Sequence, residues 1–262
     1  MAYWMIAQIA GRSTGVAGRK VMLLLMPPRA TGLVPLLLCL FSGRVLAQAS
    51  DQVVTSVQLN YPLSRKAIAK LDVAGSAQVR GVGNWDKIGM QPAVDFHLAR
   101  WADLLTQLQL DYVYQYANVN TLEIRPAIGV RLFYIPTSRV VLRNRTLLEF
   151  RDVIYLVGDT SSTSWRLRDR IELRLAINHP TFESNKLLYL IAEFEGLLNP
   201  ESAPSERFLD RFILTIGLGF RFDYTWRVEA AWQGQEAVNS TRPGDPKSVV
   251  NALQLRLMHY IR

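Results

Sequence analysis

Residues 165–175 read WRLRDRIELRL, and the chemistry of the side chains alternates from one residue to the next. The odd positions are apolar except for Asp169, whereas the even positions hold four arginines and one glutamate. Successive side chains of a β-strand point to opposite faces of a sheet, whereas a helix would scatter the two sets. The segment therefore predicts a strand with one apolar face and one charged face.

The same alternation continues along the chain from Asp51 onward, where helical periodicity is almost absent. Counting the alternating segments gives eleven candidate strands. A single-chain bacterial barrel usually has an even number, and working back from the C-terminus makes the first segment start at the end with the long loops. We therefore expect about ten strands, with residues 53–61 not spanning the barrel, and about twelve as the alternative.

The expected connections between strands fall into two classes. Three are short turns, near residues 100–101, 136–137 and 223–224. Three are longer polar loops, at residues 158–164, 199–206 and 234–248. Short turns at one end and long loops at the other are typical of membrane barrels, so the chain predicts an all-β, antiparallel, up-and-down transmembrane β-barrel.

Alternation by itself does not distinguish a membrane barrel from a soluble β-sandwich or a lipocalin-like barrel. Strands of twelve or more residues favour the membrane, because strands of globular sheets usually have about 5–6. Aromatic side chains near the strand ends also favour it, as does a polar face that mixes charge with glycine and alanine at residues 125–131. A soluble periplasmic β-barrel that binds an apolar ligand is the alternative.

In a membrane barrel the charged face points into the lumen, where a charge is costly unless it is paired. We expect arginine–carboxylate forks that fill and brace a small barrel. The predicted lumen-facing charge network comprises Glu123, Arg125, Arg131, Arg143, Arg145, Glu149, Arg166, Arg168, Arg170, Glu172, Arg174, Glu193, Glu195, Arg211, Arg227 and Glu229. Unpaired arginines that line a path for anionic solutes are the functional alternative.

Asp169 is the exception on the apolar face, because it falls near the middle of its strand. A carboxylate that faces lipid there is costly. A shifted register, or contact with another protein, would explain its position.

Residues 1–49 are typical of a secretory signal peptide. Basic residues are followed by the apolar run 33–41 and by small residues that allow cleavage after Ala47 or Ala49. The segment is long for a signal, so a start at Met22 or Met26 in place of Met1 would give a more usual length. Residues 50–262 are then expected to form a single barrel domain in the outer membrane.

Removal of the leader changes both the charge and the cysteine count of the chain. The leader holds five of the 30 basic residues and none of the 22 acidic ones, so the net charge falls from +8 to +3. The mature chain is nearly balanced, which argues against a nucleic-acid partner. Cys39 is the only cysteine and lies in the leader, so no disulfide or catalytic thiolate is expected.

Four segments together resemble a bacterial outer-membrane β-barrel family of unknown function, DUF 2490. They are LEIRPAIGVRLFY (122–134), RNRTLLEFR (143–151), WRLRDRIELRL (165–175) and FLDRFILTIGLGFRF (208–222). The resemblance implies a barrel fold in the outer membrane, but no reaction and no catalytic residues. The chain departs from an outer-membrane barrel at its C-terminus, where Arg262 stands in place of the usual aromatic residue.

The sequence shows no catalytic or metal-binding constellation. We interpret His97, His179 and His259 as surface or interfacial residues, and no His, Asp and Glu cluster has metal-ligand spacing. We therefore expect a non-enzymatic outer-membrane protein of a Gram-negative bacterium, without cofactor, in a structural or passive-transport, porin-like role. The enzymatic alternative is a lipid-modifying hydrolase. Outer-membrane lipid and the barrel-assembly machinery are the expected partners, and the sequence does not define the oligomeric state.

Overall fold

The computed structural model describes residues 50–80, 85–115, 120–136, 139–158, 160–198, 211–237 and 248–261. The predicted signal segment, residues 1–49, lies outside them. The described residues form β1 (Ser50–Pro62), β2 (Ala67–Arg80), β3 (Trp85–Ala99), β4 (Ala102–Gln115), β5 (Thr121–Pro136), β6 (Val140–Tyr155), β7 (Thr160–Ala176), β8 (Leu187–Leu198), β9 (Arg211–Arg221), β10 (Trp226–Ala237) and β11 (Ser248–Tyr260). No helix in these ranges is long and apolar enough to cross a membrane.

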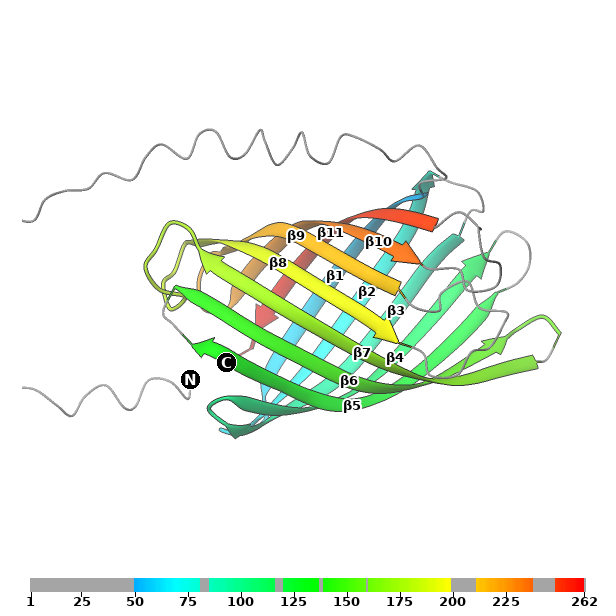
Figure 1. Ribbon diagram of the computed structural model, residues 1–262, viewed down its shortest axis with the longest axis horizontal. Coiled ribbons are helices and arrows are strands. Elements are labelled where there is room, and N and C mark those ends of the chain that lie inside the picture. The colour runs from blue at the N-terminus through cyan, green and yellow to red at the C-terminus, as the bar shows by residue number, and fades with distance from the viewer. Residues whose placement is uncertain are drawn as a thin grey trace, which may run out of the picture. The chain divides into compact units, whose positions relative to one another are not determined.

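The eleven strands close into one barrel in which each strand pairs with its neighbours in sequence (Figure 1). All hairpins are antiparallel, and β1 closes the barrel against β11 in parallel. The prediction of an all-β barrel is confirmed, whereas the predicted ten strands and the fully antiparallel closure are wrong. Residues 53–61 lie within β1, which pairs with β11 from Ser50 to Asn60. A parallel seam removes the need for an even number of strands.

Two of the predicted long loops are shorter than expected. Thr160 begins β7, so most of the predicted loop 158–164 is strand. The first residues of the predicted loop 234–248 complete β10, which ends at Ala237. The serines and threonines at residues 160–164 pair in register with Arg151–Tyr155 of β6, so their polarity does not mark a loop.

The barrel has its charged side chains inside and its large apolar side chains outside. On β7, Leu167, Ile171 and Leu173 are 37%, 48% and 37% exposed, whereas Arg166 and Glu172 are buried. The other strands show the same division, so the outer surface carries most of the exposed leucine, isoleucine, valine and phenylalanine. This arrangement is the reverse of a soluble barrel, which hides its apolar face in the interior.

An apolar cluster occupies the interior at the end of the barrel where β7 turns into β8. It consists of Ala176, Leu187, Tyr189 and Ile191, with Phe182 of the connecting turn packed against them. The rings of Phe182 and Tyr189 lie 5.8 Å apart. This cluster explains why the sequence alternation of β8 is blurred at its start, since apolar residues there occupy both faces.

Tyr189 also depends on a neighbouring glycine of β9. A Cβ atom added to Gly219 would lie 2.2 Å from the Tyr189 ring, so the ring packs directly over the glycine backbone. At Gly196, on the outer face, an added Cβ would meet only ring atoms of Phe212, at 3.8 Å or more.

We therefore predict that Gly219→Ala lowers the free energy of unfolding by about 1–3 kcal/mol, because the added methyl group must displace the ring. The matched control Gly196→Ala should leave it nearly unchanged. Denaturant unfolding of both variants in detergent, followed by tryptophan fluorescence, measures the difference. Equal stability of the two variants would contradict the packing described here.

Candidate functional site

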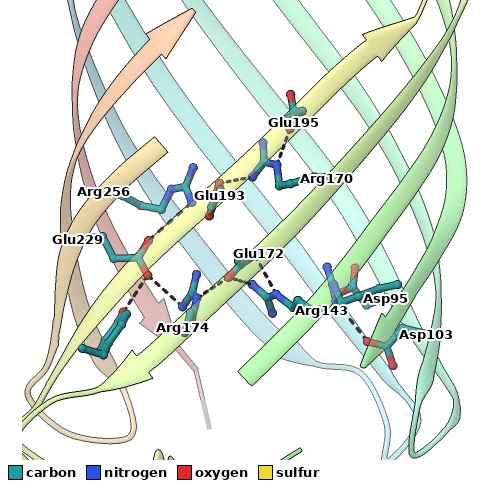
Figure 2. A network of polar contacts seen from close by, with 12 residues as sticks. Asp95, Asp103, Arg143, Arg170, Glu172, Arg174, Glu193, Glu195, Glu229 and Arg256 are labelled. Atoms are coloured by element: carbon teal, nitrogen blue, oxygen red, sulfur yellow. Dashed lines mark hydrogen bonds and ion pairs between the residues drawn. The ribbon is translucent and has the colours of Figure 1, made fainter. Parts of the chain in front are cut away.

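A chain of alternating charges runs along the interior wall of the barrel from β6 through β7 to β8. Glu149, 1% exposed, accepts hydrogen bonds from Nε and Nη2 of Arg166 at 2.8 and 2.5 Å and from Arg168 at 3.3 Å. Arg168 also donates from Nε to Glu195 at 2.7 Å. Glu195 in turn accepts from Arg170, whose Nη1 lies 2.9 Å from Glu193 (Figure 2).

The pairing follows directly from strand register. Glu149 lies opposite Arg166, and Arg170 lies opposite Glu195. Arg166, Arg168 and Arg170 therefore each have a carboxylate on a neighbouring strand, and the side chains meet without leaving their own face of the sheet.

A second group of ion pairs centres on Glu172 and Glu229. Arg143 forms a two-bonded fork with Glu172, from Nε at 2.8 Å and Nη2 at 2.6 Å. Arg174 contacts Glu172 and also Glu229, the latter at 3.0 Å (Figure 2). Glu229 accepts a hydrogen bond from the Tyr189 hydroxyl at 2.8 Å. The apolar cluster at the end of the barrel is thereby tied to the charged interior.

A third group involves acidic residues that the sequence analysis did not single out. Nη1 of Arg131 lies 2.6 Å from Asp95 and 3.2 Å from Asp103. Lys70 also contacts Asp95, and Nδ1 of His97 lies 2.6 Å from Asp103. Asp95 and Asp103 fall on the polar face of the alternating sequence pattern. Their position in this pattern could have identified them as members of the interior charge network.

The remaining predicted residues on β5 form a fourth, smaller group. Nε of Arg125 lies 3.1 Å from Glu123, and the same guanidinium contacts Asp111. Arg151 of β6 also contacts Glu123. Arg145 approaches Glu195 at 3.7 Å, which makes it a weaker member of the chain from β6 to β8.

Two predicted network residues stand apart from these groups. The side chain of Arg211 lies outside the described residues. Arg227 has no carboxylate within 4.0 Å among the described residues, and its guanidinium lies 4.5 Å from the centre of the Tyr260 ring. The other predicted members all have at least one ion pair with a described residue.

Asp169 lies on the outer face without any shift of register. It is opposite Thr146 of β6, and the pairing of β7 with both neighbours is regular. Nδ2 of Asn144 donates to both carboxylate oxygens at 3.0 Å, and the Thr146 hydroxyl donates at 2.5 Å. The carboxylate is therefore hydrogen-bonded by two neighbouring polar side chains, which lowers the cost of its position on an apolar surface.

His97 and His259 have different neighbours in the barrel. His97 belongs to the group of Asp103 and Arg131, and the His259 ring lies 4.1 Å from that of Trp226. Over the part of the chain that the structure describes, no three His, Cys, Asp or Glu side chains form a group that could hold a metal ion.

Residues 51–244 match the family described as a protein of unknown function (DUF2490). The chain belongs to the DUF2490 family. This match confirms the resemblance noted in the sequence, and in the structure it begins in β1 and includes β2 to β10. No curated protein matches this DUF2490 chain.

We predict that Glu195→Gln in this DUF2490 protein lowers the free energy of unfolding by about 3–5 kcal/mol. The substitution removes the shared carboxylate of Arg168 and Arg170 and leaves their buried charges under-compensated. Denaturant unfolding in detergent measures the loss. The control Glu183→Gln, at an exposed turn position, should change the stability little, and a similar small change for Glu195→Gln would contradict the bracing role.

Proposed function

We propose that this DUF2490 protein is a bacterial outer-membrane β-barrel with a structural, non-enzymatic role. The observation that carries the proposal is the reversed polarity of the barrel: paired charges inside and large apolar side chains outside. Exposed apolar surface on this scale is unfavourable in water, and it is satisfied when lipid chains cover it.

The ends of the outer surface support the same proposal. Tyr61, Phe222 and Trp226 are exposed at the end with the short turns, and Tyr112 and Tyr114 are exposed at the opposite end of β4. Tyrosine and tryptophan are enriched where a membrane meets water, because their rings are apolar and their polar atoms reach the interface.

A groove on the outer surface also fits a lipid environment. It has a volume of about 620 Å³ and is lined mainly by outward-facing side chains, among them Leu108, Phe150 and Trp165. Pro126 lies opposite Leu108 within this groove. Acyl chains are the ligands that would fill an apolar groove of this kind in a bilayer.

The paired charges of the interior favour a structural role over an open porin. The ion pairs cross between β6, β7 and β8, and a cavity of about 50 Å³ lies beside Arg170, Glu193 and Gln254. A water molecule needs about 10–15 Å³ of such space, so the cavity has room for a few waters. Barrels of about eight strands are filled by side chains, whereas open porins have about 16–18 strands.

Passive transport is the second candidate, because the interior is charged and holds a polar cavity. A lipid-modifying hydrolase is the enzymatic alternative, in which His97 would be the base and Asp103 the acid that orients it. A soluble barrel that binds an apolar ligand would have to expose its apolar outer surface to water.

We predict that the full chain, expressed in a Gram-negative host, fractionates with the outer membrane. It should migrate faster in an unheated gel sample than in a heated one, because the closed barrel resists detergent. Recovery in the soluble periplasmic fraction would contradict the membrane assignment. Lipid hydrolysis that is lost in His97→Gln would contradict the non-enzymatic role.

Planar bilayers then separate the structural role from passive transport. The purified protein should show no discrete conductance steps, because ion pairs such as that of Arg174 with Glu229 join strands that are not neighbours. The double variant Arg168→Ser with Glu195→Ser removes a hydrogen-bonded ion pair from the interior and should introduce conductance. Steps from the unaltered protein would instead favour passive transport.

A further inference from the structure

Two prolines interrupt the barrel wall in one row of residues that crosses the sheet. The registers of the strands bring Pro92 of β3 opposite Leu108 of β4, Leu108 opposite Pro126 of β5, and Pro126 opposite Phe150 of β6. Proline in a strand with neighbours on both sides is unusual, because it has no N–H to give to the ladder. The row therefore breaks the hydrogen bonding of the wall at two points.

The strand pairing shows which hydrogen bonds are lost. Between the described strands β3 and β4 the register is regular on both sides, but residues 91 and 92 pair with no residue of β4. Residues 125 and 126 of β5 likewise pair with no described residue of β6. In an antiparallel ladder, one missing N–H removes the hydrogen bond that two consecutive pairs share. The backbone carbonyls of Leu108 and Phe150, which face the two prolines, are thus left without their ladder donors.

This broken row forms the floor of the groove on the outer surface. Both prolines, Leu108 and Phe150 line the groove, which has a volume of about 620 Å³. Ala93 and Ala127 also line it, although each directly follows a proline and so belongs to the opposite, inward face of its strand. The groove therefore reaches backbone atoms beside each proline.

The groove combines an apolar lining with two backbone acceptors that need a donor. A carbonyl without a hydrogen-bond partner is costly in an apolar environment. Elsewhere in the groove a carbonyl does receive a donor, because the Thr106 hydroxyl donates to the Val94 carbonyl at 3.3 Å. A plain hydrocarbon chain can cover the apolar lining, but it has no hydrogen to donate to Leu108 or Phe150.

We propose that this groove binds a lipid whose acyl chain carries a hydroxyl group. The hydrocarbon packs against Leu108, Phe150 and Trp165, and the hydroxyl donates to the carbonyl of Leu108 or of Phe150. The two carbonyls lie two strands apart, which is about 10 Å at a strand spacing of about 4.7–4.9 Å. One hydroxyl therefore engages one of them.

The inference rests on the proposed lipid-facing outer surface and adds the class of lipid that this surface selects. Binding in detergent depends on the groove and not on where the barrel lies in the cell. A failure to bind therefore leaves the outer-membrane proposal in place, and recovery in the soluble periplasm leaves the binding result in place.

Native mass spectrometry of the full chain in a non-ionic detergent tests the proposal. The probes are 3-hydroxytetradecanoic acid and 12-hydroxyoctadecanoic acid, which carry the hydroxyl near the carboxyl group and near the middle of the chain. Each competes with the unsubstituted fatty acid of the same length. We expect at least one hydroxylated probe to bind more tightly by about tenfold, the effect of one hydrogen bond to an otherwise unpaired acceptor.

Replacement of the prolines tests the source of this preference. Pro92→Val with Pro126→Val keeps an apolar side chain at both positions and supplies the two missing N–H donors, so the ladder closes. The variant should stay folded and should bind hydroxylated and plain chains about equally. The matched control Pro62→Val, at the exposed end of β1, should keep the preference of the unaltered protein.

A second variant tests the place of binding without touching the ladder. Leu108→Trp puts a larger ring into the groove and should exclude both kinds of chain, and heat-modifiable migration establishes that each variant is folded. The proposal is overturned when the unaltered protein binds neither kind of chain or both equally well. It is also overturned when the double proline variant keeps the preference for the hydroxylated probe, or when Leu108→Trp binds as the unaltered protein does.

Discussion

A guanidinium that points into a closed barrel must find an anion there, and the rest of the structure depends on this requirement. Three arginines of β7, at positions 166, 168 and 170, meet Glu149 and Glu195 from the two flanking strands. A slip of one residue would turn every one of these charges outward and every leucine inward. The ion pairs and the apolar exterior therefore specify the same register.

This requirement also explains where the structure tolerates exceptions. Asp169 faces outward, but Asn144 and Thr146 of β6 hydrogen-bond its carboxylate, so the register is kept without a bare charge. At the end of the barrel where β7 turns into β8, apolar residues around Tyr189 occupy the interior in place of charges. The hydrogen bond from Tyr189 to Glu229 joins this apolar cluster to the charged interior. Arg221 and Arg227 point into the barrel without an ion pair to a described residue, and Arg221 instead donates to the Phe182 carbonyl while Arg227 lies over the Tyr260 ring.

The sequence predicted the strands well because alternation is a local signal that each strand carries by itself. The strand count was wrong because closure by a parallel β1–β11 seam leaves no local mark. The pairing of particular arginines with particular glutamates depends on the register between strands, and the amino-acid sequence alone does not define that register. Asp95 and Asp103 were missed because single acids are weak signals, although both lie on the polar face and contact Arg131.

The most direct test of the account measures which face of β7 meets lipid. Spin labels are placed at Leu167, Ile171 and Leu173 on the outer face and at Ser164 and Ala231 inside, with Cys39 replaced by serine. In reconstituted vesicles, the account predicts that the outer labels are accessible to oxygen and shielded from a water-soluble nickel reagent, whereas the inner labels are shielded from oxygen. Outer labels that are open to the nickel reagent would contradict it.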